Sequence, residues 1–254
     1  MTTDIPPVPV RQRVANSVMT FAARVGWAEP ELGGLAALVR PGDTVIDIGA
    51  SHGMYTAPLA TLVGTGGQLH SFEPHPRQQR TLRRLRSLIG ATQDTVYNAA
   101  VGSEVGEFTM RLPVRFGLPI YGHAHIADGA ASYPASVRIR TWKTPVTTID
   151  AWAAQNDASR LSFIKIDVEG FEPSVIAGGT ATIGERLPSM LLEIEDRHLA
   201  RYDRTANQFA DELRSRWPQY RMYTWVKGAW APKDVVDLST RNYLFATDAA
   251  FARP

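Results

Sequence analysis

The alternation of short apolar segments with helical segments, which begins at Asp43, constrains the fold more than any other feature of the chain. Helical patterns lie between the early apolar segments, at about 53–63 and 76–89. Strands that alternate with helices in this way form a mostly parallel sheet with helices on both faces. The sequence therefore predicts an α/β fold of about seven strands, expected near 44–48, 68–72, 94–98, 162–167, 189–194, 220–225 and 241–246.

Two segments of the chain, residues 1–42 and about 106–142, do not show this alternation. A chain of 254 residues can bury one large core, so residues 43–254 are predicted to form the main domain and residues 1–42 an N-terminal helical extension and potential lid. Residues at about 106–142 interrupt the alternation as an insertion, with strands near 106–111 and 137–142 around a loop over 112–136, and we expect it to help bind the substrate.

The N-terminal extension is predicted to be amphipathic. Val14, Val18, Phe21 and Val25 recur at helical spacing, so we expect this stripe to pack against the main domain or to cover its site. A second short helix is expected over 31–39. A membrane-surface role is the less favoured alternative.

Charge and composition exclude several classes of partner and site. The formal charge of +2 is too small to predict nucleic acid as a partner, and the absence of cysteine excludes disulfides and thiolate sites. No apolar run is long enough to span a bilayer and the first ten residues lack a signal pattern, so we expect a cytoplasmic protein. Five arginines between positions 77 and 86 indicate a basic helix face, interpreted mainly as solvated.

Residues 49–53 (GASHG) fit the G-x-S-x-G motif and also a glycine-rich turn that lets a ligand approach the backbone. The G-x-S-x-G elbow of α/β-hydrolases follows several strands, whereas only helical sequence precedes this strand, which argues against Ser51 as a nucleophile. The dinucleotide motif G-x-G-x-x-G fails because Ser51 replaces its second glycine. What remains is Asp-x-Gly-x-x-x-Gly, a glycine turn whose ligand lacks a pyrophosphate.

Two acidic residues indicate which ligand this turn binds. Asp47 lies two residues before Gly49, where a carboxylate suits a positively charged amino group and a sulfonium. Glu73 ends the second strand, twenty residues beyond Gly53, and is placed to accept hydrogen bonds from both ribose hydroxyls of a nucleoside. Together they predict S-adenosylmethionine as the cofactor. The alternative is that both carboxylates only cap strands and helices.

Six segments occur in a characteristic order and spacing: VIDIGASHGMYT, SFEPHP, NAAVG, TPVTTIDAW, FIKIDVEGFEPSVIAGG and LLEIE. With them the chain resembles the FkbM-type methyltransferases, a branch of the class I S-adenosylmethionine-dependent enzymes, from about residue 43 to residue 195. The resemblance implies a Rossmann-like class I methyltransferase sheet and methyl transfer from S-adenosylmethionine.

The resemblance also implies roles for particular residues. The glycine turn frames the methionine end of the cofactor, Glu73 holds the ribose, the NAAVG segment lines the adenine with Pro74 and His75 beside it, and Asp167 faces the methyl group and the substrate. The family turn commonly has Asn at position 51, where Ser51 is expected to cap the following helix. The predicted cofactor residues are Asp47, Gly49, Ala50, Ser51, Gly53, Tyr55, Glu73, Pro74, Asn98, Ala99, Ala100 and Asp167.

Methyl transfer to an alcohol needs a hydroxyl that is aligned with the methyl group and a general base that removes the hydroxyl proton. His198 follows the fifth strand and Asp167 ends the fourth, so both border the expected pocket. His125, like His123, lies in the insertion and could close over the substrate. These are the candidate catalytic residues.

Asp167, Glu169, Glu193 and Glu195 could gather around a hard cation. Strand alternation sends Glu193 and Glu195 to one face, however, while the other two lie across a strand end. We therefore predict no metal.

The function that the resemblance implies is O-methylation of a hydroxyl on a sugar, glycolipid or polyketide-type natural product. The alternatives are a non-catalytic protein that binds the nucleoside through the same residues, and an NAD-linked oxidoreductase on a similar sheet. We expect a small-molecule or glycan acceptor, no nucleic acid and no transmembrane segment, and we leave open a peripheral membrane contact and a homodimer.

Overall fold

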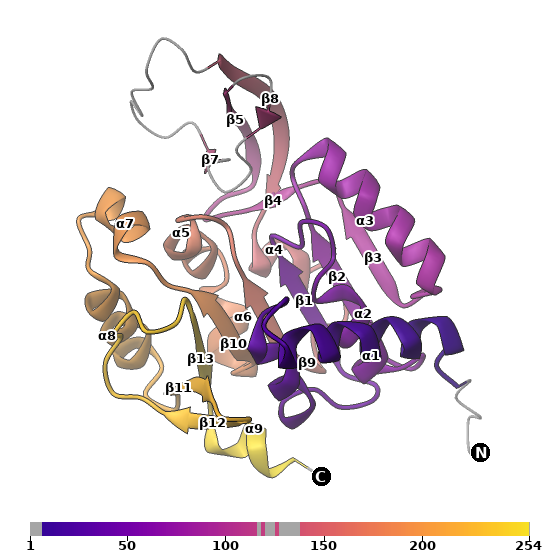
Figure 1. The fold of residues 1–254 in the computed structure, drawn as a ribbon. Helices are drawn as coiled ribbons and strands as arrows, with labels where there is room; N and C mark the ends of the chain where they lie inside the picture. The colour runs from indigo at the N-terminus through magenta and orange to yellow at the C-terminus, as the bar shows by residue number, and fades with distance from the viewer. Residues whose placement is uncertain (1–6, 116–117, 120–124, 127–137, 254) are drawn as a thin grey trace.

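An eight-stranded sheet forms the centre of the protein, and helices cover both of its faces (Figure 1). The computed structural model describes residues 7–115, 118–119, 125–126 and 138–253. In spatial order the strands are β12 (Ala229–Pro232), β11 (Arg221–Val226), β13 (Asn242–Ala246), β10 (Ser189–Glu193), β9 (Leu161–Ile166), β1 (Thr44–Ile48), β2 (Gln68–Phe72) and β3 (Asp94–Tyr97).

The sheet is mostly parallel, as predicted. The five strands from β10 to β3 pair in parallel, while β13 is antiparallel to both β10 and β11. The seven predicted strands are present, and β12 is an addition. It follows Lys227 and Gly228, whose φ angles of 50° and 83° suit a two-residue hairpin turn.

Side chains alternate between the two faces along each strand, so the sheet has a core on either side. In β1, Val45 packs into one core and Ile46 and Ile48 into the other. The covering helices are α2 (Thr56–Val63), α3 (Pro76–Ile89), α4 (Ile149–Ala153), α5 (Glu172–Ala177), α6 (Thr180–Arg186), α7 (Asp196–Leu199), α8 (Ala206–Arg216) and α9 (Asp248–Ala252), with a 3₁₀ turn η3 (Ala200–Tyr202) after α7.

Helix α3 shows how local sequence sets these elements. Its N-cap His75 accepts hydrogen bonds from the backbone N–H groups of the first turn, and Pro76 follows at a position where the missing N–H costs nothing. Gly90 ends the helix in the left-handed conformation, with a φ of 73°. Leu82 and Ile89 are buried while four of the five arginines are exposed, as the sequence predicts; Arg86 is half-buried and donates to the backbone oxygen of Asp94.

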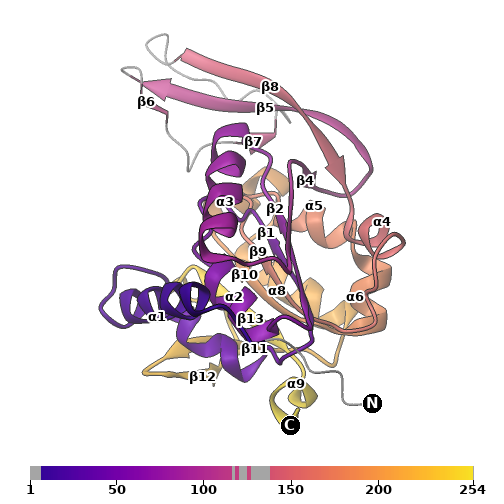
Figure 2. The ribbon, with the colours of Figure 1, turned by 90° about the vertical axis from the view of Figure 1, so that its right-hand side faces the viewer.

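The insertion is a long hairpin that extends beyond the sheet (Figures 1 and 2). Its two strands are each ten residues long, well beyond the predicted lengths, because their antiparallel pairing continues from Gly106 and Val146 to Val114 and Arg138. The elements are β4 (Ala100–Val101), β5 (Gly106–Arg115), β6 (Leu118–Pro119), β7 (His125–Ile126) and β8 (Arg138–Thr147).

The N-terminal extension consists of α1 (Val10–Arg24) and the 3₁₀ helix η1 (Pro30–Ala37), and it packs beside α2. The predicted packing face of α1 is wrong. Phe21 and its apolar neighbours are exposed, whereas Gln12 and Ala23 on the opposite side are buried. The side with Ala15, Met19 and Ala23 packs into the core beside α2, and the spacing of apolar residues alone does not reveal which side does so. None of the helices in the described residues is long and apolar enough to cross a membrane.

Candidate active site

The turn after β1 is pressed against the end of β9. Gly49 has a φ of 83°, and a Cβ atom there would lie 1.8 Å from the backbone oxygen of Asp167. The N–H groups of Gly49 and Ala50 donate to the oxygen of Phe72, at 3.0 and 3.1 Å. The turn is therefore fixed to both neighbouring strands at the point where strand order reverses, which is where ligands bind in open α/β sheets.

Glu73 lies beneath this turn. Its carboxylate accepts hydrogen bonds from the N–H of Ser51 at 2.8 Å and the N–H of His75 at 2.7 Å. Burial raises its pKa to about 7, against the lowering effect of those two bonds. Glu73 is thus a buried carboxylate just after β2, at the predicted position, and its binding of a ribose stays a prediction.

The predicted helix cap by Ser51 is wrong, because α2 begins at Thr56 and Tyr55 is its N-cap residue. Ser51 instead has a left-handed backbone, with a φ of 50°, and its Oγ accepts from Gln78 Nε2 at 3.0 Å and contacts His52 Nδ1 at 3.1 Å. Asn adopts the left-handed conformation more readily than most residues, which explains why a family turn would favour Asn here. Gly53 also has a positive φ, of 90°, and a side chain there would meet α3.

Asp47 is buried on β1, and its Oδ2 has no hydrogen-bond partner among the described residues. Burial raises its pKa to about 8, although the Lys165 ammonium lowers it. Lys165 is the register partner of Asp47 on β9, so the two side chains lie side by side on the same face of the sheet. Such an unsatisfied acceptor is a ready partner for a cationic ligand group.

Lys165 belongs to a buried polar network that was not predicted. Its Nζ donates to Asn242 Oδ1 at 3.0 Å and lies 3.5 Å from Asp167 Oδ2. Asn242 and Tyr55 both donate to Glu29 Oε2, at 2.9 and 2.5 Å, so the network joins the site to the N-terminal extension. Burial lowers the pKa of Lys165, but the surrounding carboxylates, Asp167 first, raise it by more. The pKa is therefore raised overall and the ammonium group stays charged. A lysine within a mostly apolar strand was the available sequence signal.

The chain after β9 forms a tight turn that aims Glu169 across the site. Glu172 Oε1 accepts from the N–H groups of Val168 and Gly170, at 3.0 and 3.2 Å. Glu169 is held at a φ of 54°, a conformation that non-glycine residues seldom adopt and that clusters at functional sites. Asp167 precedes this turn, with a half-buried side chain.

His198 lies opposite Glu169. It is 5% exposed in α7, and its Nε2 is 3.7 Å from Glu169 Oε2. Glu193, the last residue of β10, joins them, because ligand atoms of the three side chains all lie within 4.8 Å of one another. The expectation that Glu169 and Glu193 would not converge is wrong, since the turn after β9 redirects Glu169. Glu195 pairs with Arg197 and Arg241 instead.

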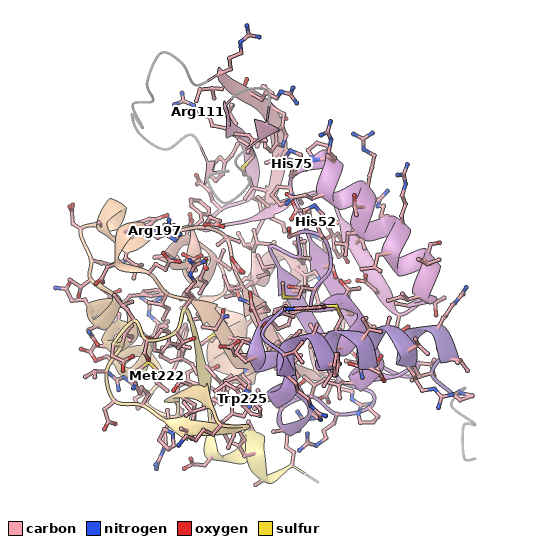
Figure 3. The ribbon with its side chains drawn as sticks, viewed as in Figure 1. His52, His75, Arg111, Arg197, Met222 and Trp225 are labelled. Carbon is pink, nitrogen blue, oxygen red and sulfur yellow. The ribbon has the colours of Figure 1, made fainter. Side chains whose placement is uncertain are left out.

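The hairpin borders the expected adenine edge. Trp142 Nε1 of β8 donates to the backbone oxygen of Pro74 at 3.1 Å, and its ring meets the edge of His75. Figure 3 shows His52 and His75 together beneath the hairpin, near the start of α3. Of the NAAVG residues, Asn98 is exposed, Ala99 is half-buried and Ala100 is buried in β4.

The hairpin histidines cannot be placed in the site. The backbone of His125 pairs with that of Arg111, but its side chain lies outside the described part of the structure. His123 also lies outside it.

A model of the FkbM methyltransferase domain matches residues 47–220. Similar solved structures include an FkbM methyltransferase from Methylobacillus flagellatus, at 19% identity and a TM-score of 0.48, over 93% of this chain and 59% of that chain. A candidate rRNA methylase from Clostridium thermocellum matches at 11% identity and a TM-score of 0.50, over 85% of this chain and 91% of that chain. A comparison with curated protein sequences finds no match.

At these identities the solved structures show the fold alone, which is the predicted Rossmann-like fold of class I S-adenosylmethionine-dependent methyltransferases. The chain spans about three-fifths of the length of the M. flagellatus protein.

Proposed function

The chain belongs to the FkbM methyltransferase family, and from this premise we propose that it is an S-adenosylmethionine-dependent O-methyltransferase acting on a hydroxyl of a sugar, glycolipid or polyketide-type natural product. One observation carries the proposal: the buried side chain of His198 lies 3.7 Å from the carboxylate of Glu169. The two residues lie at the same end of the sheet as the turn after β1. A side chain that can take up a proton, close to a turn that suits a nucleoside, favours a substrate hydroxyl that must lose its proton as it is methylated.

The residues of the turn fit the cofactor. S-adenosylmethionine supplies an electrophilic methyl group on a sulfonium and carries a cationic amino group. Asp47 offers that amino group a buried oxygen that has no hydrogen-bond partner in the described part of the chain, and Glu73 offers a carboxylate to the ribose hydroxyls. A pyrophosphate would meet two carboxylates here, which disfavours NAD.

The chain contributes alignment and proton removal. As the acceptor oxygen forms its bond to the methyl carbon and the sulfonium bond to that carbon breaks, the hydroxyl proton passes to a side chain of the protein. The two candidates in the described residues are Asp167, which directly follows β9, and His198, which lies in α7 just beyond β10. Alignment of this kind contributes up to roughly 7–11 kcal/mol, and a general base typically a factor of about 10²–10⁴.

The test is methyl transfer from labelled S-adenosylmethionine to a panel of sugars, glycolipids and polyketide alcohols. His198→Ala should lower turnover roughly 10²-fold or more while leaving cofactor affinity, measured by calorimetry, intact. An unchanged rate would move the proton-accepting role to Asp167, tested as Asp167→Asn. Cofactor binding with total inactivity across the panel would instead favour a non-catalytic binding protein.

A further inference from the structure

Three side chains from separate elements converge beside Asp167. Glu169 comes from the turn after β9, Glu193 from the end of β10 and His198 from α7, and their ligand atoms lie within 4.8 Å of one another. Each position is rigidly supported, because Glu172 organises the turn and the other two residues are buried in regular structure. Two carboxylates and an imidazole on fixed supports are a donor set for a divalent cation.

A second observation, at Glu193, points to a cation at this site. Glu193 is only 9% exposed, and its Oε2 has no hydrogen-bond partner among the described residues. Arg241 reaches only the other oxygen, at 4.0 Å, and lies closer to Glu195, at 3.2 Å. A buried carboxylate oxygen left without a partner is costly, so a bound cation would stabilise this site.

The charges around the site agree with this. A third carboxylate, that of Asp167, lies two residues before Glu169. The neighbouring cations pair more closely with other carboxylates: Lys165 Nζ lies 3.5 Å from Asp167 Oδ2, and Arg241 Nε lies 3.2 Å from Glu195 Oε1.

We propose that Glu169, Glu193 and His198 bind a divalent cation of the Mn²⁺ type. An imidazole beside two carboxylates favours a transition metal over Mg²⁺ or Ca²⁺, which prefer oxygen ligands throughout. Three protein ligands leave coordination positions open for a hydroxyl oxygen.

The role of the cation rests on the proposed O-methyltransferase function. A hydroxyl bound to the cation loses its proton more readily, because the positive charge stabilises the alkoxide. With Nε2 bound to the cation, His198 is a ligand and no longer the proton acceptor, so the hydroxyl proton passes to the second candidate base, the Asp167 carboxylate. The alkoxide oxygen attacks the methyl carbon as the sulfonium bond breaks, which leaves a methyl ether and a neutral thioether.

The test separates binding from catalysis. Mn²⁺ alone is titrated into the full chain, freed of metal with EDTA, and binding is followed by calorimetry and by the loss of the free-ion electron paramagnetic resonance signal. Glu193→Gln and His198→Gln should each weaken binding about 100-fold or more, since losing even an outer partner of a ligand costs roughly 10–100-fold. Glu195→Gln is the matched control, because this neighbouring carboxylate is committed to Arg197 and Arg241, and it should leave Mn²⁺ affinity unchanged.

No binding at millimolar Mn²⁺, or equal binding by Glu193→Gln and the unaltered protein, overturns the site; methyl transfer that persists in EDTA would then leave the proposed function standing. Binding with the expected pattern but no methylation of any acceptor would support the site and count against the function. Circular dichroism confirms that each variant is folded.

A second inference comes from a different surface. One face of α1 exposes a stripe of large apolar side chains, and because successive helical residues are about 100° apart, this stripe lies opposite the face that packs on α2. Phe21 is 62% exposed and Trp27, just beyond the helix, 85%. The members of this outer stripe are Val10, Val14, Val18, Phe21, Val25 and Trp27.

The charges around the outer stripe identify its partner. Helices α1 and α3 together carry seven exposed arginines and no acidic residue. They meet where the Arg11 guanidinium covers Gly90, and both views place them on the same side of the protein (Figures 1 and 2). We infer that this surface binds an anionic lipid bilayer, since apolar side chains bordered by arginines suit insertion at the interface between headgroups and acyl chains.

The test is co-sedimentation with vesicles of phosphatidylglycerol and phosphatidylcholine, compared with phosphatidylcholine alone. Binding should require the anionic lipid, weaken with salt, and be abolished by Phe21→Ser combined with Trp27→Ser. Val235→Ser, which removes a similarly exposed valine (58%) elsewhere, is the control and should bind normally. Absence of vesicle binding, or a dimer in solution that the double variant disrupts, would refute the lipid surface.

Discussion

The close approach of Gly49 to Asp167 can be tested against a glycine with the same backbone angle. Gly49 and Gly228 both have a φ of 83°, but a Cβ at Gly228 would have no described atom within 4 Å, whereas one at Gly49 would lie 1.8 Å from the Asp167 oxygen. Replacement by Ala imposes the same left-handed cost at both sites, roughly 1–2 kcal/mol. Only Gly49→Ala adds a clash with the backbone.

The size of that addition follows from the contacts at the end of β1. Real Cβ contacts essentially never fall below 3.0 Å, so the oxygen must recede by more than 1 Å. That movement stretches the bond from the Asp167 N–H to the Ile48 oxygen, now 3.0 Å long. Its loss adds about 0.5–1.5 kcal/mol, and the opened packing adds more. We therefore expect Gly49→Ala to lower the free energy of unfolding by about 2–4 kcal/mol and Gly228→Ala by about 1–2 kcal/mol.

Urea denaturation of the two variants measures the difference. In a chain of this size, 1 kcal/mol corresponds to a shift in Tm of about 2–4 °C, so thermal melts should separate them as well. Calorimetry with S-adenosylmethionine gives an independent readout, because only Gly49→Ala displaces the turn and should weaken binding. Equal destabilisation by the two substitutions would show that the turn does not press on β9.

Three further predictions concern the site. Glu73→Ala should weaken S-adenosylmethionine binding by roughly 1–3 kcal/mol in calorimetry, through loss of charge-assisted hydrogen bonds, and unchanged affinity in a folded variant would remove Glu73 from the site. Asp47 and Glu73 have raised pKa values of about 8 and 7, so the folded state binds protons more tightly and the free energy of unfolding should fall as pH rises from about 4 to about 8. Urea denaturation across that range should show a smaller fall for Asp47→Asn, and an equal fall would refute the assignment. Tyr55→Phe removes the bond to Glu29 and should destabilise the protein by about 1.5–3 kcal/mol, with faster trypsin cleavage in the N-terminal extension; undiminished protection would contradict the network.

Much of the fold could be predicted from the sequence because strands, helices and turns are indicated by short-range sequence patterns. The strand at 44–48 and the helix at 76–89 match β1 and α3 in their bounds, since apolar runs, a proline at the helix start and a closing glycine act within a few residues. The pair of Asp47 and Glu73 was predicted for the same reason, as strand ends and glycine turns are set by short-range sequence. The outer stripe of α1 was misread because periodicity shows that a helix has two faces but not which face meets a neighbour.

The alternation of strands and helices, the glycine turn and the two acids of the expected cofactor site were determined by sequence alone, because backbone propensity and side-chain periodicity act over a few residues. The convergence of Glu169, Glu193 and His198, and the joining of Lys165 to Glu29 through Asn242, depended on tertiary structure. These contacts depend on the order in which strands are placed in the sheet and on a turn that reverses the direction of one side chain. Neither property is encoded in the spacing of the residues concerned, because it arises only when distant segments pack together.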